Sequence, residues 1–112
     1  MIKVSVMYPN GPDAHLDEDY YVHRHMPMVG QLLGPVLQGA SVDVGVATPQ
    51  GPPPYLLIAH LWFETLEAFE SALAAHGPAL MADIPNYTNV RPIFQVSAVR
   101  LAAEPTTVHA AP

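Results

Sequence analysis

Alternating apolar and polar residues open the chain and predict a β-strand over residues 2–8. The side chains on one side of this stretch are apolar: Ile2, Val4, Val6 and Tyr8. Lys3, Ser5 and Met7 occupy the other side. Successive side chains of a strand point to opposite faces, so this strand is expected to cover a core with its apolar side.

Three further segments have strand patterns. Residues 42–46 alternate and predict a strand near a sheet edge, followed by a stiff proline-rich loop over residues 48–54. Residues 55–63, YLLIAHLWF, are apolar on both sides, with His60 as the one polar residue. That pattern is typical of a central strand covered on both faces. A fourth strand is predicted over residues 93–101.

Helical spacing predicts two helices between these strands. Asp17 is a good N-cap for the first, which ends at Gly34. Its inward face is expected to carry Tyr21, His25, Met28, Val29 and Leu32. Pro27 lies inside this pattern and predicts a kink or break, because its ring nitrogen cannot donate a hydrogen bond.

Thr65 is expected to cap the second helix, which is predicted to run to about residue 75. The sequence His76-Gly77-Pro78 then interrupts it, and a short helical turn follows. The expected inward residues are Leu66, Phe69, Leu73 and Leu80.

The order of elements is β-α-β-β-α-β, which predicts an α+β domain of ferredoxin-like type. Right-handed crossovers place both helices on one face of a four-stranded antiparallel sheet. We expect one domain over residues 1–101 and a mobile tail over residues 102–112.

Two helices cover one sheet face only, and the central strand is apolar on both. Tyr55, Leu57, Ala59, Leu61 and Phe63 are assigned to one side, and Leu56, Ile58 and Trp62 to the other. An open apolar face usually marks an interface, so a homodimer joined through its sheet faces is expected. The alternative is a monomer whose tail folds across the sheet. If the two sheets enclose a chamber, its polar lining is expected to come from five side chains: His60, Lys3, Ser5, Gln95 and Ser97.

Composition narrows the possible partners. Half the residues are hydrophobic, 12% are charged and the net charge is −6 with four cations, so nucleic acids and anionic membrane surfaces are not expected to bind. The chain has no cysteine, which excludes disulfides and thiolate chemistry. No apolar run is long enough to cross a membrane, and the first residues lack the layout of a signal peptide, so a cytoplasmic protein is expected.

Two histidines are the candidate catalytic residues. His25 follows Tyr21 by four residues, so both share the inner helix face, where a partly buried imidazole suits proton transfer. His60 needs a hydrogen-bond partner because it lies in an apolar strand. For both, a structural histidine is the alternative. His23 and His25 point to different sides of a helix, so no metal site is expected.

The remaining candidates would bind a substrate. Tyr87 is placed at the mouth of the chamber, with loop packing as the alternative. Lys3 either steers an anion or reaches solvent from an edge, and Ser5 and Gln95 are the polar residues beside it. Tyr8, Tyr21 and Trp62 are expected as walls of the site, or as ordinary core.

Three stretches resemble the EthD family, named for a locus of ethyl tert-butyl ether degradation. They are MIKVSVMYPN at residues 1–10, Asp19-Tyr-Tyr21 with His25-Met-Pro27, and ADIPNYT at residues 82–88. The resemblance spans residues 1 to about 101 and implies a dimeric α+β barrel. Relatives on this fold include lactone isomerases, cofactor-free monooxygenases of aromatic polyketides, polyketide cyclases and haem-handling proteins.

Two classes of function are therefore open. The first is a cofactor-independent enzyme that isomerises or oxidises a small, apolar, oxygenated substrate in a chamber between helices and sheet. In it, His25 or His60 moves a proton while Tyr87 or Lys3 stabilises an oxyanion. The second is a non-catalytic carrier of a hydrophobic intermediate. Haem binding through His25 or His60 is a third possibility that the fold allows.

Overall fold

The computed structural model describes residues 1–103, and these contain one four-stranded antiparallel sheet. The strands are β1 (Ile2–Pro9), β2 (Gly39–Val44), β3 (Tyr55–Phe63) and β4 (Ile93–Ala98), in the order β2-β3-β1-β4. The apolar strand β3 is central, as its pattern predicted, and β2 lies at an edge.

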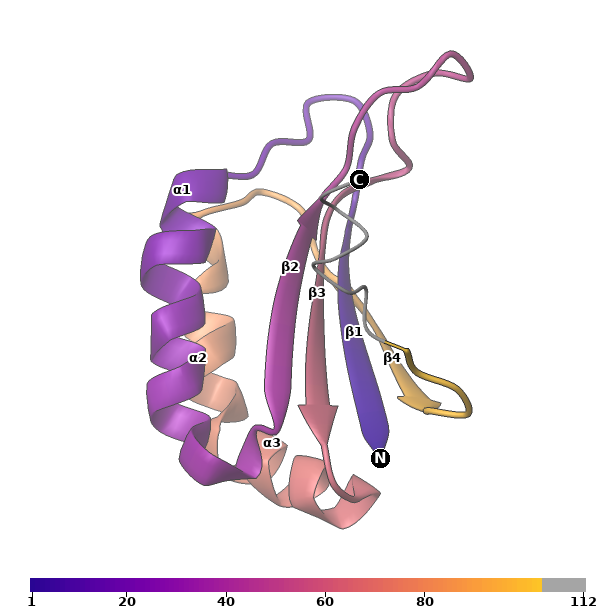
Figure 1. The fold of residues 1–112 in the computed structure, drawn as a ribbon. Helices are drawn as coiled ribbons and strands as arrows, with labels where there is room; N and C mark the ends of the chain where they lie inside the picture. Colours follow the sequence, from indigo (N-terminus) through magenta and orange to yellow (C-terminus); the bar gives the residue numbers. More distant parts are fainter. Residues whose placement is uncertain (104–112) are drawn as a thin grey trace, which may run out of the picture.

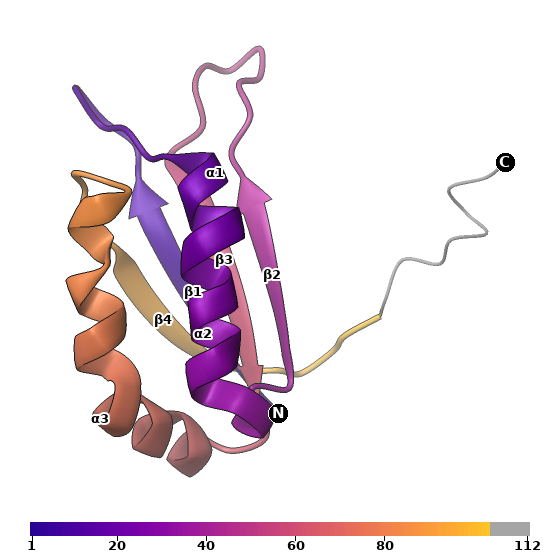
Figure 2. The same cartoon turned by 90° about the vertical axis from the view of Figure 1, so that its left-hand side faces the viewer.

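The helices lie together on one side of the sheet (Figures 1 and 2). The first is continuous from α1 (Glu18–Tyr20) through a π-helical turn (Tyr21–His25) to α2 (Met26–Leu33), and the second is α3 (Leu66–Ala82). Short 3₁₀ turns follow at Gly34–Val36 and Ile84–Asn86. This confirms the predicted ferredoxin-like βαββαβ arrangement.

A kink or break was predicted at Pro27, but the irregular turn of the first helix lies before it, at Tyr21–His25. The wider turn of Tyr21–His25 bonds the Met26 N–H to the Tyr21 carbonyl, while Pro27 sits at the start of α2. Proline is tolerated there because the first helical N–H groups need no partner within α2. The chain thus avoids a kink by widening one turn.

The inward face of the first helix differs in part from its prediction. Tyr21, His25 and Val29 are buried as expected, and Leu33 is buried in place of Leu32. Met28 is half-buried. The wider π-helical turn changes which residues share a face, so the uniform 3.6-residue period failed here.

The predicted interruption of the second helix was wrong. Helix α3 continues through Pro78 and ends only at Ala82. An interior proline costs about 3 kcal/mol. The turn beyond Pro78 packs Leu80 against the core, and one such side chain contributes roughly 1.5–3 kcal/mol. Leu66 was wrongly placed inward, since it is 42% exposed at the start of α3.

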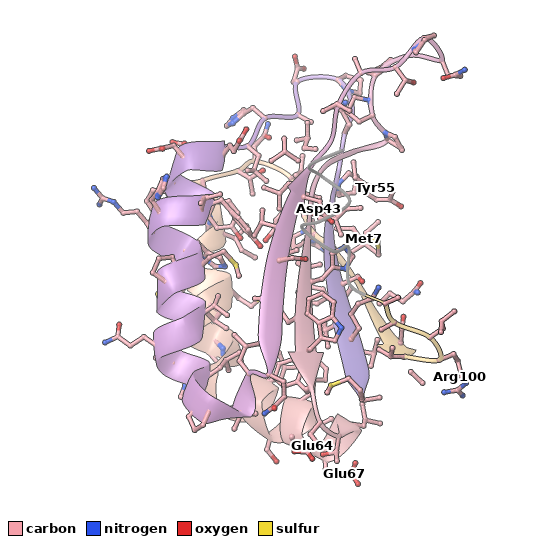
Figure 3. The ribbon with its side chains drawn as sticks, viewed as in Figure 1. Met7, Asp43, Tyr55, Glu64, Glu67 and Arg100 are labelled. Carbon is pink, nitrogen blue, oxygen red and sulfur yellow. The ribbon has the colours of Figure 1, made fainter. Side chains whose placement is uncertain are left out.

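The strand register confirms most of the assigned faces. Leu57, Ala59 and Phe63 are buried on the helix side, whereas Lys3, Trp62 and their neighbours share the open side. Tyr55 is the exception. The register shifts after Tyr8 and pairs Tyr55 with Pro9, which puts Tyr55 on the open side with Met7 (Figure 3).

Strand β4 ends at Ala98, three residues before the predicted end at Leu101. The loop over residues 48–54 projects beyond the sheet in Figure 1. The mobile tail was predicted over residues 102–112, of which residues 104–112, with His109, lie outside the described part of the chain.

Candidate functional site

A narrow apolar cavity lies between the helices and the inner face of the sheet. Its volume is about 70 Å³, enough for several water molecules or a small ligand. Aliphatic and aromatic side chains from β1, β3, α2 and α3 form most of its wall. Four polar side chains interrupt this lining: Tyr8, Tyr21, His25 and Tyr87. A small apolar site with a few polar groups is typical of ligand pockets.

His25 is held by a carboxylate. Its Nδ1 atom lies 2.9 Å from Oδ2 of Asp83, at the end of α3. Because a carboxylate only accepts hydrogen bonds, Nδ1 must carry the proton. The neutral ring then has its lone pair on Nε2, the form that accepts a proton.

The second ring nitrogen of His25, Nε2, has no hydrogen-bond partner in residues 1–103. Within residues 1–103, every fully buried side-chain nitrogen or oxygen has a hydrogen-bond partner. Nε2 of His25 has no partner in that part of the chain, so it is not fully buried, and the ring lines the cavity. Tyr21 stacks on the ring at 5.0 Å, and Tyr87 lies 4.8 Å away between centroids. These contacts fix the direction of Nε2.

Asp83 accepts hydrogen bonds from three side chains. Besides His25, the Tyr20 hydroxyl donates to Oδ1 at 2.8 Å and the Asn86 amide donates at 2.9 Å. Burial alone would raise the pKa of Asp83, but the bonds from Asn86, His25 and Tyr20 outweigh it and hold the pKa below its usual value. Asp83 is therefore a carboxylate that fixes the orientation of the His25 ring.

Three tyrosines meet beside this pair. The hydroxyls of Tyr8 and Tyr87 are 2.6 Å apart, and the ring of Tyr21 packs edge-on against both. Burial, together with the neighbouring phenols, raises the pKa of Tyr8 and Tyr21, and burial is the main cause that raises the pKa of Tyr87. All three phenols stay protonated at neutral pH and serve as hydrogen-bond donors.

A second polar cluster lies on the opposite face of the sheet. Oγ of Ser5 is 3.1 Å from Nδ1 of His60, and Nε2 of His60 is 3.2 Å from Oδ2 of Asp43. Figure 3 shows Asp43 and Met7 on the side away from the helices. The Asp43 side chain is 67% exposed, whereas that of His60 is 19% exposed.

This Ser-His-Asp arrangement lacks one requirement of acyl transfer. The nucleophile needs backbone N–H groups aimed at a developing oxyanion. Ser5 lies in the middle of β1, which is paired with β3 on one side and β4 on the other. Its neighbouring backbone amides are used by the sheet, so the cluster orients His60 and offers no oxyanion hole.

The structure thus divides the predicted site residues between two faces. Tyr8, Tyr21, His25 and Tyr87 meet at the inner cavity. The other candidates share the open face: Lys3, Ser5, His60, Trp62 and Gln95.

Sequence reasoning missed Asp83, Tyr20 and Asp43. Asp83 lies in ADIPNYT, one of the stretches that resemble the EthD family, and this was the one feature of the local sequence that pointed to it. Its partner His25 is 58 positions away in sequence, so only the fold joins them.

The βαββαβ order, with both helices on one face of the sheet, defines a ferredoxin-like α+β domain. The chain belongs to the EthD domain family, whose pattern matches residues 13–91. No curated protein matches the sequence.

Solved structures agree with this assignment. An EthD-like protein from Ralstonia eutropha JMP134 is 36% identical, with 91% of this chain and 94% of that chain covered and a TM-score of 0.86. An ethyl tert-butyl ether degradation family protein from Bacillus halodurans C-125 is 18% identical, with 89% and 99% covered and a TM-score of 0.65. HapK from Hahella chejuensis is 12% identical, with 95% and 99% covered and a TM-score of 0.58. The last two show the fold alone.

Residues 1–103 contain neither a membrane-spanning helix nor a metal-ligating cluster of three side chains. No helix there is both long enough and apolar enough to cross a membrane. No group of three or more metal-ligating side chains occurs in the same range.

Proposed function

We propose that the inner cavity catalyses a cofactor-independent proton transfer on a small, apolar, carbonyl-containing molecule. The observation that carries this proposal is the His25–Asp83 pair, 2.9 Å apart, placed beside tyrosine hydroxyls in an apolar cavity. A base, a group that orients it and a donor for an oxyanion are the parts that such a reaction needs.

The proton transfer divides between His25 and the tyrosines. Nε2 of His25 takes a proton from a carbon next to the substrate carbonyl. The electron pair of that C–H bond forms a carbon–carbon double bond, and the π pair of the carbonyl moves onto its oxygen. Asp83 stabilises the imidazolium that results. Where the substrate carries a carbon–carbon double bond conjugated with this enolate, the imidazolium returns its proton at the far carbon of the conjugated system, which leaves an isomer of the substrate and restores the neutral base.

The tyrosine pair can stabilise the enolate oxygen. Only one proton lies between the hydroxyls of Tyr8 and Tyr87, so the hydroxyl that accepts this bond keeps its own proton for a ligand. The raised pKa values keep that donor protonated. Oxidation of an activated phenol, the other reaction considered from the sequence, also begins with proton removal by such a base.

Deuterium exchange tests the proposal without knowledge of the natural substrate. A panel of small cyclic ketones and lactones is incubated with the protein in D₂O, and incorporation is followed by mass spectrometry. We expect acceleration by the wild type, a loss of about 100-fold in His25→Ala, and a smaller loss in Tyr87→Phe. Binding of the same compounds is measured by calorimetry.

The two classes of function separate in these data. Exchange that disappears in His25→Ala while binding persists supports the enzyme. Binding without any exchange above the His25→Ala level refutes it and favours the carrier. Ala72→Leu is the cavity control, because Ala72 is 9% exposed and lines the cavity from α3. It is expected to reduce both binding and exchange.

We also propose that two copies associate through their open sheet faces. The helices cover only the other side (Figure 1), and the open face carries the apolar residues Met7, Ile58, Trp62 and Ile93. Ile93 is 50% exposed in the single chain. Burial of this face against its own copy is the simplest way to remove that apolar surface from water.

A further inference from the structure

A surface groove lies next to the inner cavity. It has a volume of about 640 Å³ and is formed by the end of α3 and the segment that leads into β4. Met81, Ile84 and Phe94 line both the groove and the cavity. The two hollows are therefore neighbours, separated by no more than these three side chains.

The charges around these hollows are unusual for this chain. The protein has ten Asp and Glu residues and a net charge of −6. No carboxylate is among the residues that line either hollow, whereas Arg91 lines the groove. A strongly acidic protein thus presents a cation, and no acidic side chain, in the groove beside its cavity.

The polar neighbours of Arg91 are already occupied. Oγ1 of Thr88 donates to the His15 carbonyl at 2.7 Å and accepts from the Val90 N–H at 3.1 Å. The amide of Asn89 bonds to the backbone of His15 and Asp13 at 3.0 and 2.8 Å. Their side-chain hydrogen bonds hold the loop together, so they are poorly placed to recognise a ligand.

The guanidinium of Arg91 is available to bind an anion. It is exposed, and it forms no salt bridge with any residue in the range 1–103. Its planar guanidinium matches a carboxylate through two parallel hydrogen bonds. Apart from Arg91, Thr88 and Asn89, the groove is lined by aliphatic side chains, prolines and Phe94. Such a surface suits an apolar molecule with one anionic end.

We infer that the ligand of this site is an apolar carboxylic acid, with its carboxylate on Arg91 in the groove and its apolar end in the cavity. That the apolar end of this ligand reacts at His25 rests on the proposed function. The contact at Arg91 does not depend on that reaction. It defines the substrate class and orients the molecule so that the carbon to be deprotonated faces His25.

Matched acids and amides test the inference. The probes are phenylacetate, 4-phenylbutanoate and 6-phenylhexanoate, each compared with its neutral primary amide by calorimetry at low salt. We expect the wild type to bind at least one acid about tenfold more tightly than its amide. Arg91→Gln should remove that preference and leave amide binding within twofold. Arg100→Gln is the control, because Arg100 lines neither hollow.

Every outcome of this test bears on the inference. An acid preference that survives in Arg91→Gln, or that Arg100→Gln removes equally, overturns it. Failure of the folded wild type to bind any of the six probes also overturns it. His25→Ala separates the two proposals: an acid preference retained in that variant supports the anion contact even if no exchange reaction is ever found.

Discussion

Asp83→Asn is the substitution that most directly tests the geometry of the inner site. The carboxylate accepts hydrogen bonds from His25, Tyr20 and Asn86. An asparagine amide keeps one acceptor oxygen and replaces the other by a donor. At least one of the three donors therefore loses its partner in a partly buried place, since the Asp83 side chain is 14% exposed. Such a loss costs about 1–3 kcal/mol.

We expect the variant to be less stable than the wild type by about 2 kcal/mol at pH 7. For a domain of this size that corresponds to a fall of roughly 10 °C in Tm. Asp19→Asn is the matched control. The Asp19 side chain is 89% exposed and faces His23 at 3.6 Å, so its loss should cost well below 1 kcal/mol.

The pH dependence has a definite sign. Folding lowers the pKa of Asp83 below its ordinary value of 3.8, so the unfolded chain binds the proton more readily. The stability that Asp83 contributes is fully present above pH 3.8 and is lost as the pH falls through the folded pKa. The difference between wild type and Asp83→Asn should therefore be constant from pH 7 to 5 and shrink below pH 4.

Urea unfolding followed by circular dichroism at a series of pH values measures this difference. If the difference in unfolding free energy between wild type and Asp83→Asn stays constant or increases below pH 4, Asp83 is not held as a carboxylate. The absence of any difference at pH 7 would show that its three hydrogen bonds do not form.

Two further predictions concern the frame and the proposed interface. Gly30→Ala should stabilise the protein by about 1 kcal/mol, because Gly30 lies within α2 with open space at its Cβ position. Gly45→Ala should destabilise it by more than about 2 kcal/mol, because a Cβ there would overlap the Tyr55 carbonyl oxygen and Pro53. Thermal unfolding of both variants measures the two effects, and equal changes in Tm would contradict the backbone geometry. Ile58→Asp should give single subunits in sedimentation and should red-shift the fluorescence of Trp62, the one tryptophan of the chain. Val46→Asp is the control and should change neither, because Val46 lies in a loop and is 71% exposed. A wild type that sediments as a monomer at high concentration would refute the proposed dimer.

The sequence predicted the sheet well because strand patterns are local. The bounds of β3 and its central position followed from a run that is apolar on both sides. The two-residue period placed His60, Lys3 and Gln95 each on one side of its own strand. That these sides form one face was an assumption, and the register agrees with it.

The helices were predicted less well because proline acts differently in different tertiary settings. Pro27 is accommodated by a wider turn, and Pro78 is retained within a helix that packs Leu80 on the core. Pro27 costs little at the start of α2, whereas Pro78 lies inside α3, and the packing that offsets its cost comes from residues far away in sequence.

The candidate site could be predicted only as a set of residue types. Tyr21 and His25 were placed together by helical spacing, but Asp83, which fixes the proton on His25, lies 58 positions away. The assumption of a single chamber also had to be replaced, because Ser5 and Tyr8 are separated by three positions and therefore point to opposite faces of β1.

The two predicted catalytic histidines are consequently separated by the sheet itself, and this separation can be measured. His25 lines the cavity with Val4 and Val6, whereas His60 pairs across the ladder with Ser5, on the other face. His25→Ala should reduce deuterium exchange about 100-fold and leave the subunit equilibrium intact. His60→Ala should leave exchange within a few-fold and shift that equilibrium, with His23→Ala as the exposed control for both. The double variant should show the sum of the two effects, because distant sites that share no partners behave independently. If His60→Ala reduced exchange as strongly as His25→Ala, the reaction would not belong to the inner cavity alone, and its assignment to the helix side of the sheet would be wrong.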